Sequence, residues 1–199
     1  TSNFTPSTSA LTAISGTVLL TCQSNRFKDN SASAHAVTIS STSETTDGVP
    51  TVSAFTPFLT SKVYKPTVNG ASGWFSGVDD AASYAANLNL VASGDSDSDF
   101  YFGTGDFTLE GWFYPTGVGH TASSAYAVAF GVMMTVYIYK NLSISWSCSL
   151  SNTAAASSAV ISATYANTNI NPLFFQWNHW AITRSGSNMS IFLNGTRLG

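Results

Sequence analysis

The chain has 199 residues, of which 44% are hydrophobic and 13% are aromatic, and this composition excludes an intrinsically disordered protein. Only 9% of the residues are charged and the formal net charge is −3, so the chain lacks the basic stripe that typically binds nucleic acid. No apolar run reaches the roughly 18 residues that a membrane-spanning helix needs.

The N-terminal part of the chain is polar before it becomes strand-like. Residues 1–16 are rich in Ser, Thr and Pro and show no apolar period, so we interpret them as a linker or extended arm. Residues 17–22, Thr-Val-Leu-Leu-Thr-Cys, predict a short strand. Residues 36–40 and 51–58 predict two more, separated by an Asp-Gly-Val-Pro turn. We therefore expect residues 17–69 to form N-terminal strands and loops.

Apolar and polar residues alternate in several later segments, which indicates further strands. Asn194-Gly195 between apolar runs is a strong signal for a β-hairpin. About a dozen short strands, with no sustained helical period, predict an all-β antiparallel sandwich or jelly roll. The expected strands cover residues 85–91, 107–114, 125–139 with a break at Gly131, 142–150, 160–165, 174–183, 189–193 and 196–198.

The two cysteines, Cys22 and Cys148, both lie in strand-like runs. We expect each to act as a small buried hydrophobic residue. The sequence alone leaves open whether they pair.

Two segments far apart in the sequence carry a family resemblance. Residues 107–116 read Phe-Thr-Leu-Glu-Gly-Trp-Phe-Tyr-Pro-Thr, and residues 177–184 read Trp-Asn-His-Trp-Ala-Ile-Thr-Arg. The hairpin Ile-Phe-Leu-Asn-Gly follows at residues 191–195. Their order and spacing resemble those of laminin G-like domains, which are concanavalin A-like lectin or glucanase β-sandwiches. The resemblance implies such a sandwich over residues 70–199, preceded by the segments 1–16 and 17–69.

A second resemblance concerns the source of such a chain. Residues 17–31 are similar to a segment that precedes these domains in marine phage structural proteins, notably those of cyanophages. Residues 1–6 look like the tail of a preceding domain of the same kind. This implies a virion-surface or extracellular location and an oligomeric assembly with neighbouring subunits of the same or another structural protein.

Domains of this family usually continue past the hairpin with further strands, so we expect the sandwich to be incomplete at Gly199. Because an unpaired sheet edge attracts other strands, we hypothesise that a neighbouring subunit or a missing segment completes the sheet.

Five residues form the candidate ligand-binding surface. Glu110, Trp112 and Tyr114 share one face of a predicted strand, and Trp177 and His179 share one face of another. Sugars stack on aromatic rings, and polar groups bind their hydroxyls, so this set predicts a site for cell-surface glycan. The alternative is that loops or another strand cover this face and that Trp112 belongs to the core.

A short acidic run offers a candidate metal site. Asp95, Asp97 and Asp99 resemble the start of a calcium loop, but the Gly and Glu that an EF-hand requires are absent. Two interpretations stay open, a solvated loop and a calcium site. No other cofactor is expected.

Enzymatic activity is not expected, and we assign no catalytic residue. Glycoside hydrolysis needs two carboxyl groups about 5–9.5 Å apart. Asp106 and Glu110 share strand parity, but four residues of extended chain separate them by about 13 Å. No serine lies in the context of a nucleophile elbow.

Three functions follow from the sequence. The first is a non-enzymatic module of a virion, such as a phage fibre or tail-associated protein, that recognises host-surface glycan. The second is a purely architectural capsid decoration, cement or filament subunit. The third is a secreted glycoside hydrolase, which the missing acid pair disfavours. None involves nucleic acid or membrane insertion.

Overall fold

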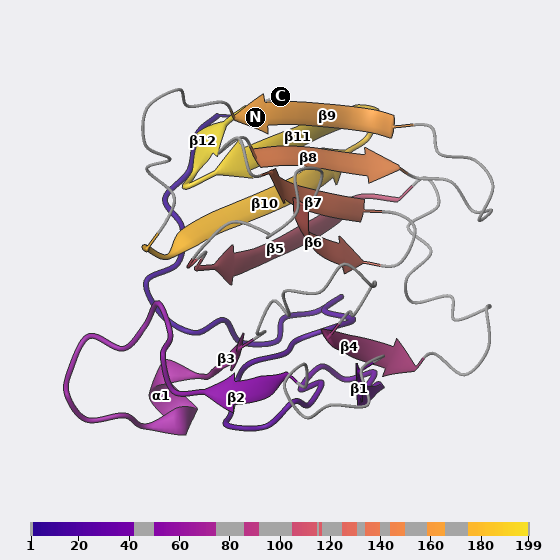
Figure 1. Ribbon diagram of the computed structural model, residues 1–199. Coiled ribbons are helices and arrows are strands. Elements are labelled where there is room, and N and C mark those ends of the chain that lie inside the picture. The colour runs from indigo at the N-terminus through magenta and orange to yellow at the C-terminus, as the bar shows by residue number, and fades with distance from the viewer. Residues whose placement is uncertain are drawn as a thin grey trace. The chain divides into compact units, whose positions relative to one another are not determined.

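The computed structural model describes residues 2–41, 50–74, 86–91, 105–114, 116, 125–130, 134–139, 144–149, 159–165 and 175–198. Every strand pair is antiparallel. Figure 1 shows the strands and the single described helix, α1 (Pro66–Asn69). The strands are β1 (Ala36–Ser41), β2 (Thr51–Ser53), β3 (Ser72–Trp74), β4 (Ala86–Val91), β5 (Phe107–Phe113), β6 (Ala125–Phe130), β7 (Met134–Tyr139), β8 (Ile144–Ser149), β9 (Ala159–Tyr165), β10 (Asn178–Ser185), β11 (Asn188–Leu193) and β12 (Thr196–Arg197).

The predicted all-β antiparallel sandwich is confirmed, and most predicted strands are present. Strand β4 covers residues 86–91 of the strand expected at 85–91, and residue 85 lies outside the described residues. The position of the expected break, Gly131, lies between the bounds of β6 and β7. The one-turn helix α1 was not expected, because a single turn is too short to show a helical period. Among the described residues, no helix has the length and apolar character to cross a membrane.

Three strand predictions are wrong in extent or in kind. Residues 17–22 form no strand. Their backbone makes hydrogen bonds with a loop instead of a neighbouring strand, since the Leu20 carbonyl accepts from the Asn30 N–H. In addition, Cys22 has a φ of 66°, which lies outside the extended region. The strand expected at 51–58 ends at Ser53. The strand expected at 174–183 begins at Asn178, since Phe175 has a φ of 56°, which an extended strand cannot contain.

The chain divides into two compact units, one formed by Thr1–Pro6 with Tyr101–Gly199 and the other by Ser7–Phe100. The first unit holds two four-stranded sheets, in the orders β12-β11-β10-β5 and β6-β7-β8-β9. Strand β9 of one sheet lies against β11 of the other. The segment boundaries predicted from the sequence, after residue 16 and after residue 69, stay predictions.

One row of buried residues in the described part of the first unit lies on one face of β10 and β11. Ile182 of β10 is paired with Ile191 of β11, and both have no exposed surface. Trp180, two residues earlier, is paired with Leu193, and both are buried. Burying each such side chain contributes about 1.5–3 kcal/mol, so this row stabilises the sheet and fixes its register.

The second unit holds the pairs β1-β4 and β2-β3 and a loop organised by one buried carboxylate. Asp29 Oδ1 accepts from the N–H groups of Leu20 and Ser31 at 2.9 and 2.8 Å. Asp29 Oδ2 accepts from the N–H of His35 at 2.9 Å and lies 2.8 Å from its Nδ1. Burial raises the pKa of Asp29, but these hydrogen bonds outweigh it and hold the pKa well below its usual range. Asp29 thus joins residues 20, 31 and 35 in the ionised state.

Cys22 is a free cysteine and is only half-buried. Burial is the main cause that raises the pKa of its thiol, which favours the unreactive protonated form. Its carbonyl accepts from the Ala71 N–H at 2.8 Å. The side chain of Cys148 lies outside the described residues.

The Asp29 cluster predicts an acid-sensitive second unit. The pKa of Asp29 is lower in the folded than in the unfolded chain. Its ionised carboxylate therefore makes its full contribution to the free energy of unfolding above the unfolded-state pKa of about 3.9, and this contribution is lost as the pH falls through the folded-state pKa. We expect Asp29→Asn to lower the free energy of unfolding by about 2–4 kcal/mol at pH 7. Chemical denaturation between about pH 7 and pH 2 should show a steeper acid loss in the wild type than in the variant. Equal pH slopes would contradict this assignment.

The close approach of β5 to Trp180 gives a second prediction. A Cβ added at Gly111 would lie 3.1 Å from Trp180 Nε1 and 3.2 Å from two ring carbons. Gly111→Ala should therefore displace the indole and destabilise the protein by about 1–3 kcal/mol. The cost should shrink in a Trp180→Phe background, where the ring is smaller, and a double-mutant cycle measures this coupling. Additive effects would show that the indole does not require Gly111.

Candidate functional site

The candidate site lies on the face of the first sheet opposite the buried Trp180–Ile182 row. Directly paired residues share a face, and three cross-strand rows cover it. Trp112 is paired with His179, Glu110 with Ala181, and Thr108 with Thr183. On the other side of β10, Ala181 is paired with Phe192, and Thr183 with Ser190. Two strands of this face therefore carry aromatic, carboxylate and hydroxyl groups in successive rows.

A turn at the end of the hairpin fixes the position of His179. Asn194 and Gly195 have φ values of 48° and 77°, as a two-residue type I′ hairpin turn requires, so the hairpin predicted at Asn-Gly is confirmed. The His179 N–H donates to Asn194 Oδ1 at 2.8 Å, and the Asn194 N–H donates to the His179 carbonyl at 2.8 Å. Asn194 Nδ2 also donates to Asn178 Oδ1 at 3.1 Å. One asparagine thus forms the turn and anchors the strand next to it.

His179 is the most buried member of the predicted ligand-binding set. Its side chain is 2% exposed, and its Nε2 lies 3.1 Å from Glu110 Oε2. The donor in this pair is the Nε2–H, because a carboxylate oxygen can only accept. The Nδ1 atom is buried and has no hydrogen-bond partner within the described part of the chain. The Glu110 side chain remains 34% exposed, so its carboxylate meets the histidine on one side and solvent on the other.

The predicted aromatic residues meet in two ring pairs. Trp112 contacts His179 edge to face, with ring centroids 5.0 Å apart. Tyr114 contacts Trp177 in the same way at 5.4 Å. Trp112, Tyr114 and Trp177 are each half-buried. The structure therefore brings all five predicted residues together on β5, β10 and their flanks, with His179 inside and Glu110 at the surface.

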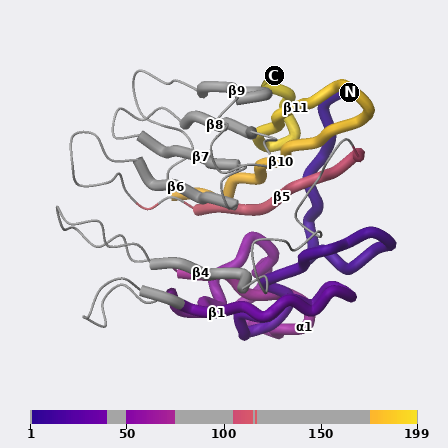
Figure 2. Tube along the Cα trace, turned by 90° about the vertical axis from the view of Figure 1, so that its right-hand side faces the viewer, coloured from indigo at the N-terminus to yellow at the C-terminus, as the bar shows by residue number. Residues whose placement is uncertain are grey.

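The N-terminal segment is the part of the site that sequence reasoning missed. The Phe4 N–H donates to the Gly195 carbonyl at 3.0 Å, and the Arg197 N–H donates to Asn3 Oδ1 at 3.0 Å. The Phe4 ring contacts Phe192 and His179 edge to face, at centroid distances of 5.1 and 5.7 Å. Figure 2 shows this segment, in indigo, running beside the yellow hairpin. Residues 1–16 show no apolar period that could signal this docking.

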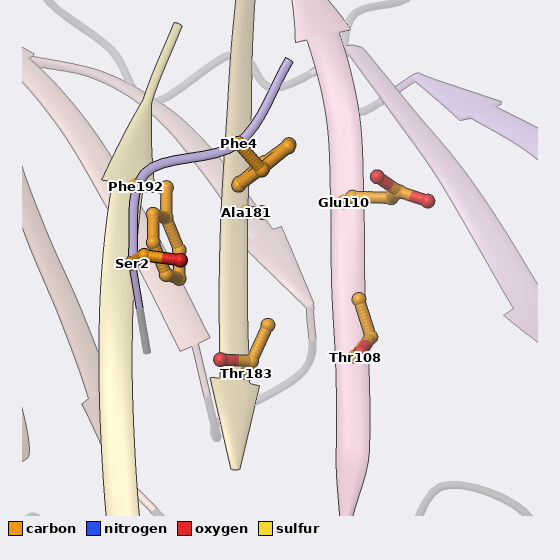
Figure 3. Close-up of a pocket in the computed structure, with 7 residues that line it drawn as sticks. All are labelled: Ser2, Phe4, Thr108, Glu110, Ala181, Thr183 and Phe192. Atoms are coloured by element: carbon orange, nitrogen blue, oxygen red, sulfur yellow. The ribbon is translucent and has the colours of Figure 1, made fainter. Parts of the chain in front are cut away.

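A shallow groove of about 400 Å³ opens between the N-terminal segment and β5. Its floor is formed by two small side chains of β10, the methyl group of Ala181 and the hydroxyl-bearing Thr183, as Figure 3 shows. In Figure 3, Phe192 of β11 lies on one side and Glu110 of β5 on the other, while Phe4 lies over β10 near Ala181. Because Ala181 sits between Glu110 and Phe192 in register, its short side chain leaves this space open. The groove is lined by Ser2, Phe4, Thr108, Glu110, Ala181, Thr183 and Phe192.

The remaining acidic predictions have separate outcomes. Asp95, Asp97 and Asp99 lie outside the described residues, so calcium binding there stays a prediction. Within the described ranges, no group of three or more His, Cys, Asp or Glu side chains could hold a metal ion. Asp106 Oδ1 accepts from the Gly186 N–H at 2.7 Å, which ties the entry of β5 to the β10–β11 turn.

Comparison with known proteins identifies the family. Residues 89–199, more than half of the chain, match the laminin G-type model of the concanavalin A-like lectin/glucanases superfamily. The chain therefore belongs to this superfamily. Searches of curated proteins and of solved structures returned no match. The matched residues include every residue that lines the groove except Ser2 and Phe4. Membership of this superfamily is consistent with a carbohydrate-binding or other non-enzymatic module.

The anchoring role of Asn194 gives a third prediction. Asn194→Ala should destabilise the protein by about 2–3 kcal/mol, because Ala is strained at positive φ and the buried His179 N–H loses its acceptor. Asn194→Gly removes the acceptor but tolerates the backbone, so its cost should be smaller by about 1 kcal/mol. Thermal and chemical denaturation of both variants measure the difference. A glycine variant as unstable as the alanine variant would contradict the backbone part of this account.

Proposed function

We propose that this protein is a non-enzymatic carbohydrate-binding module that uses the groove beside Glu110. The observation that carries the proposal is the composition of this groove. It combines the partly exposed ring of Phe4 and the buried ring of Phe192 with hydroxyl groups and one half-exposed carboxylate, at a volume of about 400 Å³. Small-molecule sites usually span about 300–1,000 Å³ and join apolar walls to a few polar groups.

The chemistry of the groove suits a sugar ring. The C–H face of a pyranose packs against aromatic surface, and Phe4 is 38% exposed at the groove. A carboxylate accepts hydrogen bonds from sugar hydroxyls, and Glu110 is held by the Nε2 of His179 with part of its surface left open. Thr108 and Thr183 present hydroxyls that can both donate and accept. Trp112, on the other side of His179, would extend this aromatic surface beyond the groove.

Two features support a binding role over hydrolysis. Glu110 is the only carboxylate among the residues that line the described groove, whereas glycoside hydrolysis needs a pair. Asp106, which directly precedes β5, accepts a hydrogen bond from the Gly186 N–H at the β10–β11 turn. The proposed activity is therefore reversible recognition of a glycan.

The proposed setting is the surface of a virion or another extracellular assembly, with the module as part of a phage fibre or tail-associated protein that contacts host glycan. The resemblance of residues 17–31 to phage structural proteins supports this setting. Among the described residues, strand β5 is paired only with β10. The proposed partner for its other edge is a strand of a neighbouring subunit, which would complete the sheet.

A glycan array with the full chain tests the proposal, followed by calorimetric titration of each glycan that binds. Glu110→Gln, which keeps the shape of the side chain but removes its charge, and Trp112→Ala should each weaken binding roughly tenfold or more. Trp74→Ala, a matched control at a half-exposed tryptophan of the other unit, should leave affinity unchanged.

Melting temperatures of all three variants separate loss of binding from loss of folding. The proposal would be wrong if no glycan bound the folded chain, or if Glu110→Gln and Trp112→Ala both bound as tightly as the wild type.

A further inference from the structure

The groove is assembled from two parts of the chain that are far apart in sequence. Its floor and its carboxylate side come from β5 and β10, within residues 107–185. Ser2 and Phe4 come from the N-terminal segment, which belongs to the same compact unit although residues 7–100 form the other. Part of the groove wall is therefore supplied by a short segment whose next residues along the chain belong to the other unit.

The contacts of that segment define a specific docking place. Its backbone is held by the hydrogen bond from the Phe4 N–H to the Gly195 carbonyl, and its side chains by the bond from the Arg197 N–H to Asn3 Oδ1. The Phe4 ring fits against His179 and Phe192. A Cβ at Gly195 would collide with the Phe4 carbonyl, so only glycine at this position lets the segment lie so close.

We infer that residues 2–4 form a separable wall of the groove, and that docking of this segment and occupation of the groove by a glycan stabilise each other. The inference rests on the proposed function for its glycan part. A ligand that contacts both the Phe4 ring and Glu110 binds the docked form more tightly than the undocked form. By linkage, the same ligand must then favour docking by the same factor.

Phe4 also determines specificity in this arrangement. The Phe4 ring contacts His179, and the Nε2 of the same histidine lies within hydrogen-bond distance of Glu110. His179 therefore contacts both the aromatic residue and the carboxylate of the groove. A sugar with an apolar face and a hydroxyl on its edge can contact both sides at once. When the segment leaves, the floor residues Ala181 and Thr183 remain, but the Phe4 side of the wall is lost.

The test cuts the segment free after the full chain has folded. A specific protease site replacing residues 7–9, of which Thr8 and Ser9 are exposed, allows cleavage of the intact protein. A synthetic hexapeptide with the sequence of residues 1–6 is then titrated back by calorimetry. The control is the same peptide with alanine in place of phenylalanine.

We expect the hexapeptide to bind the cut protein and the control peptide to bind at least roughly tenfold more weakly. Affinity for each glycan that the array identifies should fall roughly tenfold or more after cleavage and recover with the hexapeptide but not with the control. Unchanged glycan affinity after cleavage, or equal binding of the two peptides, would overturn the inference.

The two proposals fail in different ways. If the intact chain binds no glycan, the proposed function fails while specific rebinding of the hexapeptide still supports the separable wall. If the intact chain binds glycan and the cut chain binds it equally well, the proposed function stands and the wall is rejected. Phe4→Ala in the uncut chain gives a second measure, since it removes the ring but keeps the backbone bond to Gly195.

Discussion

The sheet and the candidate site of the first unit depend on the burial of strand β10 on both of its faces. Its residues 178–182 and 184 are all buried, and it is paired along both edges, with β5 and with β11. On one face Trp180 and Ile182 form the core with β11. On the other face His179, Ala181 and Thr183 form the base of the candidate site. Because side chains alternate between the two faces of a strand, the packing that fixes the core residues also fixes the positions of the site residues. A shift of the strand register by one residue would move the core residues to the site face and the site residues to the core face.

This constraint explains why the site is buried at His179 and exposed at Glu110. His179 is held through its backbone by Asn194 and through its ring by Glu110 and Trp112. Glu110 lies on β5, where alternate residues are exposed, so its carboxylate can be positioned without being enclosed. Functional groups supported by packed neighbours on rigid elements keep their geometry better than groups on loops. The N-terminal segment adds the Phe4 ring to the groove, and there we place the adjustable part of the site.

The sequence predicts those features that follow from local patterns. Alternation predicts β5, because its exposed residues Thr108 and Glu110 face away from Leu109, and Asn194-Gly195 predicts the hairpin from turn chemistry. Phe4 could not be found in this way, because the Asn3–Arg197 bond beside it spans 194 residues and the segment has no period. Residues 17–22 were predicted as a strand because they are apolar, yet a buried carboxylate nine residues on organises them instead. Nothing in the local sequence distinguishes Asp29 from a solvated acid.

We propose that the face of β5 and β10 around Glu110 recognises carbohydrate. The most direct measurement is an amide chemical-shift titration by nuclear magnetic resonance, with a panel of free monosaccharides at high concentration. We expect the binding sugars to shift the amides of Glu110, Ala181 and Thr183, and of Phe4 on the N-terminal segment. Shifts confined to residues away from β5 and β10, or no shift with any sugar of the panel, would contradict it.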